Sequence, residues 1–347
     1  MRAQGPWLLP IVIALALSAC IPASSGPRTS APPPSAQLPP ASPSIVQRPA
    51  WQAQTVTPDA LTIGASVYTV RAGDTLTAIA SRTGAGVNAI AAANDIEPPY
   101  IIQIGQRLDI PAGRYHRVRR GETGIAISRA YGVDWSRVVT LNQLEDPYIL
   151  RVGQRIMLPS DTEIAAMSRE DRAAAFNLDI DDIITGGEPA IRQNEAPVAP
   201  VRTATVDLPA SAAVRSPANF AGRFGWPLTG PILTGFGAAG PGQRNNGIDI
   251  AARRGTPVLA AADGTVLYAG DEIQVHGGLV LISHGDGWIT AYGHMEDLQV
   301  ARGQRVERGQ IIARAGQSGQ VDQPQLHFEI RRNRQPVDPG PHLPNLD

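Results

Sequence analysis

The sequence predicts a multidomain chain in which two small α+β modules, each ordered strand–helix–helix–strand, precede an all-β antiparallel domain. Three observations predict this architecture. The 347 residues include 35 glycines and 31 prolines but only 5% aromatic side chains, as is typical of small modules joined by extended linkers. One segment is repeated at a constant spacing, and beyond residue 222 short β-branched runs alternate with glycines. The expected boundaries are a leader at 1–19, a disordered linker at 20–66, modules at 67–111 and 115–159, a second linker at 160–222 and the all-β domain at 223–347.

The N-terminus has the features of a secretory signal. An apolar run from Trp7 to Leu17 follows Arg2 and is too short to span a bilayer comfortably. The sequence Leu17-Ser18-Ala19-Cys20 resembles the bacterial lipobox, which implies lipidation of Cys20 and a membrane contact through that anchor. Cys20 is the only cysteine, and a lone thiol in an oxidising compartment is otherwise a liability. The alternative is a plain signal peptide with an incidental cysteine.

Composition and charge narrow the location and the partners. Ile21 rather than Asp follows Cys20, and by the sorting rule of enteric lipoproteins this resembles an outer-membrane address facing the periplasm. The formal net charge of −1 gives no electrostatic reason to expect a nucleic-acid partner. Residues 21–66 are rich in Pro, Ala and Ser and cannot pack a core. We expect them to hold the folded part away from the membrane.

The internal repeat covers Tyr68–Pro111 and His116–Pro159 at a spacing of 48 residues, as from Gly73 to Gly121. Self-similarity of this kind means that one supersecondary unit occurs twice. The second copy departs from the first at Gly124, which we expect to weaken its first helix by about 1 kcal/mol.

Each copy has the signals of two strands and two helices. In the first copy, residues 67–70 alternate as a half-buried strand does. Asp74 or Thr75 is placed to cap a first helix, and apolar residues recur at helical spacing behind it. A second helix is expected over about 87–93, followed by a closing strand at 107–111 that ends in proline.

The opening Tyr-x-Val-x-x-Gly-Asp-Thr-Leu and the closing Gly-Gln-x-Leu-x-Ile-Pro of the first copy resemble the LysM module. The resemblance implies binding of glycan strands of peptidoglycan, which contain N-acetylglucosamine, in a shallow groove. The alternative for each single residue is maintenance of the fold, through helix capping by the asparagines and packing by the tyrosines. The groove residues implied are Gly73, Asp74, Thr75, Leu76, Asn94, Tyr100, Ile101, Gly121, Thr123, Asn142, Tyr148 and Ile149.

The second linker has two features of its own. Residues 163–176 have a helix-forming composition, which predicts a short helix. The acidic run at 179–182 is expected to be a solvated segment, with docking to a basic partner as the alternative.

The last 125 residues predict an antiparallel all-β domain. Residues 256–266 predict a strand–turn–strand pair around Asp263-Gly264. The β-branched runs at 279–284 and 288–292 predict another pair of strands.

Three motifs in this domain resemble those of the LytM (M23) peptidoglycan endopeptidases, His-x-x-x-Asp, a lone His after a strand, and His-x-His. They are Asn245-Asn246-Gly247-Ile248-Asp249, Tyr292-Gly293-His294 and Gln325-Leu326-His327. The resemblance implies that Asp249 and His327 are zinc ligands and that His294 is a catalytic histidine. Asn245 then occupies a ligand position and Gln325 a catalytic position.

These two replacements predict that the chain holds zinc weakly or not at all, and they argue against hydrolysis. A catalytic zinc keeps three protein ligands and one open position for water, and Asp249 and His327 supply only two. A neutral amide such as Asn245 is a poor zinc ligand, and Gln325 cannot titrate as a general acid or base does. A zinc metalloendopeptidase of family M23 is the alternative, and zinc is a cofactor only under that interpretation. Rescue by other histidines is possible in principle, but we expect ordinary strand-end or surface roles for His276, His284 and His342.

Within that family, Arg244–Ile250 and Gly270-Asp271-Glu272-Ile273 look like the branch of NlpD-type murein hydrolase activators. The resemblance implies a non-catalytic lipoprotein that activates an N-acetylmuramoyl-L-alanine amidase during septal wall splitting and cell division. The implied partner cleft comprises Asn245, Gly247, Asp249, His294, Gln325 and His327. A third hypothesis is a purely structural wall tether that acts through its LysM modules.

Overall fold

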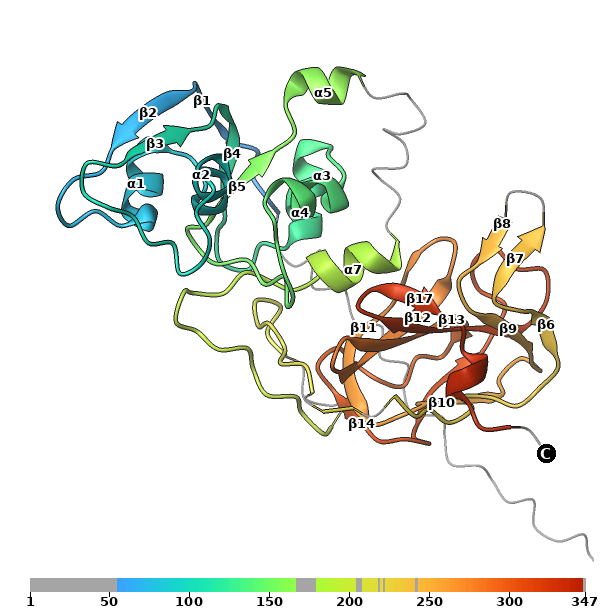
Figure 1. Cartoon of the computed structure of the whole chain (residues 1–347). Coiled ribbons are helices and arrows are strands. Elements are labelled where there is room, and N and C mark those ends of the chain that lie inside the picture. The colour runs from blue at the N-terminus through green and yellow to red at the C-terminus, as the bar shows by residue number, and fades with distance from the viewer. Residues whose placement is uncertain are drawn as a thin grey trace, which may run out of the picture. The chain divides into compact units, whose positions relative to one another are not determined.

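The computed structural model describes residues 55–166, 179–203, 208–217, 219–220, 222–240 and 243–345, coloured in Figure 1, which fall in one compact unit of the chain. The leader, the lipidation prediction at Cys20 and most of the helix predicted over 163–176 lie outside these residues. Within the described part, no helix is long and apolar enough to cross a bilayer.

The first repeat has the predicted order of two strands and two helices. Its strands are antiparallel, with Tyr68 opposite Leu108. Thr75 is the N-cap of the first helix, because its hydroxyl accepts a hydrogen bond from the amide of Ala78 at 3.1 Å. The core consists of aliphatic side chains that include Leu76, Ile79, Ile90 and Leu108. The elements are β2 Ser66–Thr69, α1 Leu76–Thr83, α2 Val87–Ala93 and β3 Arg107–Ile110.

The second repeat has the same order of elements and its own core. Thr123 caps its first helix and Asp134 caps its second, each through a side-chain oxygen that accepts from a backbone amide. A short helix, α5 Asp161–Ala166, follows the second repeat and overlaps the start of the helix predicted over 163–176. The elements are β4 Gly113–Arg117, α3 Gly124–Tyr131, α4 Trp135–Leu141 and β5 Arg155–Leu158.

Gly124 is the first residue of α3 and lies directly against Trp135. A Cβ atom added to Gly124 would lie 2.3 Å from Cζ2 of Trp135, and one added to Gly186 would lie 2.5 Å from its Nε1. The indole N–H donates to Thr185 Oγ1 at 3.0 Å. The expectation that Gly124 only weakens its helix is therefore incomplete, because the missing side chain makes room for the indole ring.

A short strand ahead of the first repeat joins the two modules. Strand β1, Leu61–Ile63, lies within the segment expected to be linker, but it pairs antiparallel with β4 of the second repeat, with Leu61 opposite Tyr115. Val56 is buried in the core of the second repeat, while Tyr115 is buried in the core of the first. The linker prediction for 20–66 is therefore wrong for its last residues, where a brief β-rich run completes a three-stranded sheet, β1-β4-β5.

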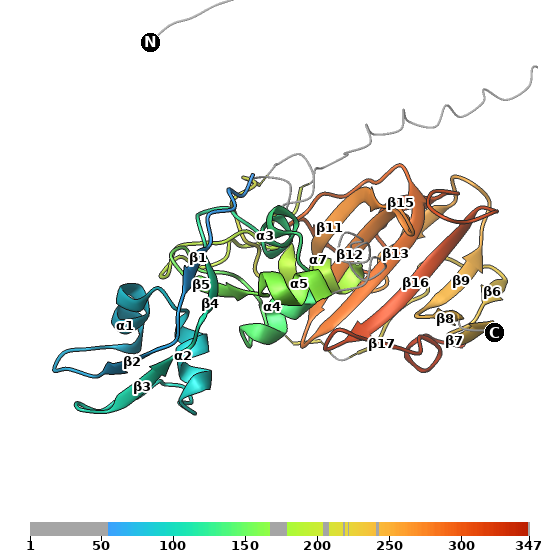
Figure 2. The ribbon, with the colours of Figure 1, turned by 90° about the horizontal axis from the view of Figure 1, so that it is seen from above.

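The C-terminal domain confirms the all-β prediction. Its ten-stranded sheet is antiparallel throughout, and seven of the strands follow the order β14-β11-β12-β13-β16-β9-β6. Off this path, β15 pairs with β13 and β10, and β17 pairs with β16. Figure 2 shows the long strands of this sheet side by side. The pairing predicted across Asp263-Gly264 is not formed, because β10 pairs with β15 instead. The elements are β6 Ile232–Thr234, β7 Gly237–Gly240, β8 Gln243–Asn245, β9 Ile248–Ala251, β10 Pro257–Leu259, β11 Gly264–Ile273, β12 Gly277–Gly285, β13 Trp288–Glu296, β14 Arg305–Val306, β15 Ile311–Ala315, β16 Gln325–Arg332, β17 Gln335–Val337 and the 3₁₀ helix η2 Gly340–His342.

The central strands β12 and β13 are buried on both faces, which explains their nearly continuous apolar sequence. One face contributes Val280, Ile282 and Tyr292 to the main core, and the other contributes Leu279, Leu281 and Ala291 to a second cluster. The second cluster is completed by the linker helix α7, Ile180–Gly186, through Ile180 and Ile183.

The acidic run of the second linker is therefore part of a packed helix. Asp179 is the N-cap of α7 and exchanges hydrogen bonds with Asp182 in a capping box. Asp181 forms an ion pair with Arg331 of β16, with 2.7 Å between Oδ1 and Nη2. The prediction of a solvated segment is wrong here, because isoleucines three residues apart give the helix an apolar face.

Replacement of Gly124 by alanine is expected to destabilise the chain by about 2 kcal/mol, because the methyl group overpacks the site filled by Trp135. Helix propensity alone gives the opposite sign, a gain of up to about 1 kcal/mol. Chemical denaturation with and without Gly124→Ala separates the two. Gly64→Ala is the control, because a Cβ there meets no atom within 4 Å, and it should change the free energy of unfolding by less than about 0.5 kcal/mol.

Candidate functional site

The three family motifs meet on neighbouring strands of the ten-stranded sheet. In the antiparallel register, His327 of β16 lies opposite Asp249 of β9 on one side and opposite Gly293 of β13 on the other. His294 follows Gly293 and has a positive φ of 61°, a backbone conformation that is uncommon for a residue with a side chain. Sheet pairing thus brings together residues that are up to 78 positions apart in the sequence.

His327 is held between two carboxylates. Its Nδ1 lies 2.7 Å from Asp249 Oδ1, and its Nε2 lies 3.0 Å from Glu329 Oε1. Burial alone lowers the pKa of His327, but the bonds to Asp249 and Glu329 outweigh it and raise that pKa to about 9. The protonated ring donates from both nitrogens, and a metal ion would have to displace one of these protons to bind.

Asn245 completes the surroundings of Asp249. Its Nδ2 donates to Asp249 Oδ2 at 3.1 Å, and its Oδ1 accepts from the amide of Gly247 at 3.2 Å. Burial raises the pKa of Asp249, but the hydrogen bond with His327 outweighs it and lowers that pKa overall. Both carboxylate oxygens of Asp249 are therefore engaged by side chains of this cluster.

Sequence reasoning missed Glu329 and Arg331, which extend the cluster along β16. Arg331 Nη1 lies 2.6 Å from Glu329 Oε2, and its Nη2 reaches Asp181 of α7. Residues two apart on a strand lie on one face, so the polar alternation His327, Glu329, Arg331 in an apolar strand was the available signal. The result is a run of alternating charge, Asp249–His327–Glu329–Arg331–Asp181, which is buried at its three central members and which we call the charge run.

His276, for which an ordinary strand-end or surface role was expected, lies in the turn between β11 and β12 and belongs to this site. Its ring centroid lies 5.4 Å from that of His327 and 6.4 Å from that of His294. Its Nδ1 is buried without a hydrogen-bond partner among the described residues. Burial, together with the positive charge of His327, lowers the pKa of His276 to about 4, so this ring is neutral.

The other two spare histidines lie elsewhere, as expected. His284 is buried and bonds to Asp263 O at 2.7 Å and to Thr290 Oγ1 at 2.8 Å. His342 packs edge-on against Trp288, with 5.0 Å between ring centroids.

The residues predicted to line an open cleft are almost fully buried. Asn245, His294, Gln325 and His327 expose only 8%, 6%, 9% and 7% of their surfaces. Gly247 offers no surface either, because a Cβ there would lie 2.2 Å from the carbonyl oxygen of Phe328. Exposed apolar side chains flank this cluster instead, and they include Leu233 beside Thr234 and Val275 beside His276.

In this structure the side chains of the three motifs are bonded to one another or to the backbone. Within the described residues, no group of three His, Cys, Asp or Glu side chains is arranged to hold a metal ion. Asp249 binds His327 and Asn245, and His294 Nδ1 lies 2.9 Å from the carbonyl oxygen of Ser318. A proton on His327 satisfies the two carboxylates that face it, which is the charge balance a cation otherwise supplies.

The predicted glycan residues divide into two groups. Several are committed to the fold: Leu76 is in the core, Thr75 and Thr123 cap helices, and the Asn94 and Asn142 side chains each tie a helix end to the closing strand with three hydrogen bonds. Others are accessible, above all Ile101, which is 73% exposed. The similarly exposed Ile104 was missed, although it belongs to the same loop.

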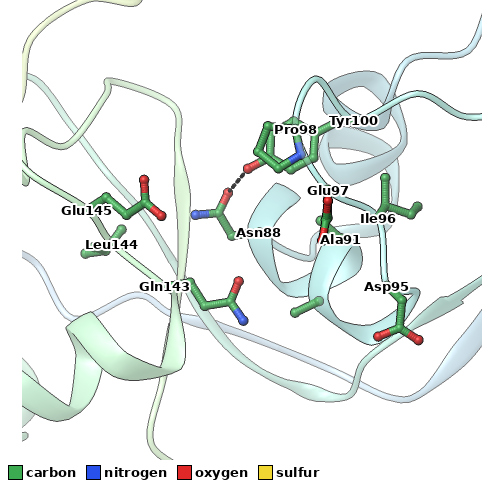
Figure 3. Close-up of a pocket in the computed structure, with 11 residues that line it drawn as sticks. Asn88, Ala91, Asp95, Ile96, Glu97, Pro98, Tyr100, Gln143, Leu144 and Glu145 are labelled. Carbon is green, nitrogen blue, oxygen red and sulfur yellow. Dashed lines mark hydrogen bonds between the residues drawn. The ribbon is translucent and has the colours of Figure 1, made fainter.

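A hollow of about 450 Å³ lies between the two modules. In Figure 3, Tyr100 and Asn88 of the first module face Gln143 and Glu145 of the second. The hydroxyl of Tyr100 donates to Asn88 Oδ1 at 3.5 Å. Tyr100 therefore lines a surface that both repeats share.

Comparison with known protein families shows that the chain combines two LysM domains with a domain of Peptidase family M23. Residues 68–111 and 116–159 match the LysM domain, and residues 243–339 match Peptidase family M23. The chain is 36% identical over 303 residues to the Lipoprotein NlpD/LppB homolog of Pseudomonas aeruginosa, a match that covers 80% of this chain and 76% of that protein. The chain belongs to the NlpD/LppB lipoprotein family.

Two further relatives carry functional names. The Murein hydrolase activator NlpD of Salmonella typhimurium is 31% identical over 284 residues, covering 81% of this chain and 69% of that protein. The Cell division protein DipM of Caulobacter vibrioides is 46% identical over 129 residues, which is 35% of this chain but only 21% of that protein.

His327 is expected to stay protonated at neutral pH and to titrate near pH 9. Because this pKa is raised above the unfolded value near 6.5, the stabilisation is complete below about pH 6.5 and is lost as the pH rises through about 9. Glu329→Gln should lower the pKa, since it removes one carboxylate, whereas Glu296→Gln, on an exposed pair with Arg254, should not. NMR titration of the imidazole measures this, and an ordinary pKa near 6.5 in the unaltered chain would contradict it.

Proposed function

We propose that this protein is a peptidoglycan-binding envelope lipoprotein that activates a cell-wall amidase during septal wall splitting and cell division, without catalysis of its own. Relatives named as a murein hydrolase activator and as a cell division protein support the first part. The observation that carries the second part is His327, whose two ring nitrogens are both bonded to carboxylates.

Hydrolysis requires a metal-bound water and a general acid or base, and the side chains of this site do not favour either. A zinc hydrolase needs a metal-bound water that ionises near neutral pH, and an imidazolium at the ligand position opposes the binding of a cation. Gln325 lies two residues before His327 on β16 and cannot exchange a proton in place of histidine. A metalloendopeptidase is therefore the less favoured function.

The remaining parts of the chain suit localisation. The tandem LysM modules bind glycan strands, and the lipid predicted on Cys20 anchors the chain in the outer membrane, facing the periplasm. Two or more acyl chains give stable anchoring where one does not. The amidase then meets its activator next to its substrate.

His276, His294 and His327 form a cluster of rings, which we call the histidine cluster. The partner, an N-acetylmuramoyl-L-alanine amidase, contacts the surface that borders this cluster. The cluster itself is buried, so the available surface consists of what borders it. Asn245 Nδ2 lies 3.5 Å from the carbonyl of Thr234, next to exposed Leu233, and the amide of His294 donates to the carbonyl of His276, next to exposed Val275. Apolar residues around a polar centre are a common composition for a protein interface.

Zinc binding by the unaltered chain is expected to be weak, with much less than one zinc per chain by elemental analysis at neutral pH. Asn245→His should raise the affinity, because it restores an imidazole four residues before Asp249. Asn246→His is the control, since the same imidazole one residue away is out of register. Turnover should stay low in both variants while Gln325 remains. One tightly bound zinc per unaltered chain would overturn the metal-free interpretation.

Activation is tested by dye release from labelled peptidoglycan with three samples: this chain, an amidase of the same organism, and both. Release is expected to rise above the amidase level only in the mixture. Dye release by the chain alone would support the endopeptidase function. If the chain increases dye release by no amidase of the same organism, the structural wall tether becomes the favoured function.

The docking surface is tested in the same assay by Leu233→Glu and Val275→Glu. Each should weaken amidase binding by about thirtyfold, since loss of a central interface side chain costs about 2 kcal/mol. Ile311→Glu, on another exposed apolar residue of the domain, should have little effect. Equal activation by all three variants would place the contact elsewhere.

A further inference from the structure

A second cavity, of about 610 Å³, opens between the two LysM modules. The first module contributes Ser81, Val87 and Tyr100 to its wall, and the second contributes Arg117, Arg151 and Arg155. The volume lies within the range of small-molecule sites, about 300–1,000 Å³.

The cavity has fixed walls because the modules approach closely. Asn88 Nδ2 donates to the carbonyl of Asn142 at 2.8 Å, and Arg155 Nη2 donates to that of Ser81 at 3.3 Å. A Cβ added to Gly86 would lie 2.5 Å from the carbonyl oxygen of Arg155, so only glycine allows this approach. Strand β1 precedes the first module and pairs with β4 of the second, which holds the two together.

The wall of this cavity is strongly basic. Three arginines line it and no described carboxylate does, although the whole chain has a net charge of −1. Arg151 is bonded to the backbone carbonyls of Arg192 and Glu195, and Arg155 to that of Ser81. Arg117 is exposed, and within the described residues none of the three forms an ion pair. Guanidinium groups without a counter-charge favour an anion, and their fork geometry matches a carboxylate.

This basic wall is not part of the repeat. At the spacing of 48 residues, the counterparts of Arg117 and Arg151 in the first module are Thr69 and Gln103. The counterpart of Arg155 is Arg107, which does not line the cavity. The basic character therefore belongs to the junction and not to the LysM module as such.

We propose that this junction cavity binds the carboxylates of the peptide stems that branch from a peptidoglycan strand. The proposal rests on the proposed function, because the LysM modules must hold the glycan from which those stems branch. Tyr100 and Ile149, both predicted glycan contacts, line the same cavity and offer aromatic and apolar surface to a sugar ring. A strand seated there brings its peptide carboxylates to Arg117 and Arg155. The protein thus recognises peptidoglycan from which an amidase has not yet removed the peptides.

The test compares two ligands by calorimetry with the purified full chain. One is soluble glycan strands that carry their peptides, and the other is the same strands after an amidase has removed them. The unaltered chain should bind the peptide-bearing strands about tenfold more tightly at low salt, and the preference should shrink at high salt, where charges are screened. Arg117→Gln combined with Arg155→Gln should abolish the preference, so that peptide-bearing and stripped strands bind with equal affinity. Arg107→Gln is the matched control and should keep the preference, and thermal unfolding confirms that each variant is folded.

The outcomes separate this proposal from the function on which it rests. Equal or tighter binding of stripped strands by the unaltered chain would overturn the junction site while leaving glycan binding in place. A preserved preference in the double variant would overturn it as well. No binding of either ligand would refute glycan recognition, and the junction site with it, whereas activation of the amidase is measured independently by dye release.

Discussion

The imidazolium of His327 between Asp249 and Glu329 is the interaction on which the rest of the C-terminal domain depends. Buried carboxylates are costly unless they are paired, and these two face each other across one ring. Here the protonated ring of His327 pairs with both of them. This pairing ties β9 to β16 across the site.

The same charge run connects the site to the remainder of the chain. Arg331 forms ion pairs with Glu329 on one side and with Asp181 of α7 on the other. Ile180 and Ile183 of α7 are almost fully buried. One turn further on, Thr185 accepts the indole N–H of Trp135 from the second LysM module. The segment between the modules and the sheet is therefore a structural element, held by buried ion pairs, apolar contacts and a tryptophan packed against two glycines.

Sequence alone was sufficient for the local elements and for the repeat. Thr75, the helix over 87–93 and the all-β character of the last domain follow from capping and periodicity, which are local properties. It was insufficient where a short segment is ordered by distant partners. Leu61–Ile63 becomes a strand only because β4 offers an edge. The partner of Asp181 is Arg331, which lies 150 residues further along the chain. The position of His276 was likewise missed, since the turn that carries it is placed by the sheet. Motif spacing identified Asn245 and Gln325 but not their burial, which depends on how the strands pack.

The central claim is that the fold of a hydrolase here acts without chemistry of its own. Mass spectrometry of the fragments released from purified peptidoglycan tests it most directly, because an amidase and an endopeptidase cut different bonds. The account predicts that the chain and an amidase together release only fragments cut between the glycan and its peptides, in greater amount than the amidase alone. Fragments in which the cross-links between peptides are cut, formed with the chain present and absent without it, would contradict the account.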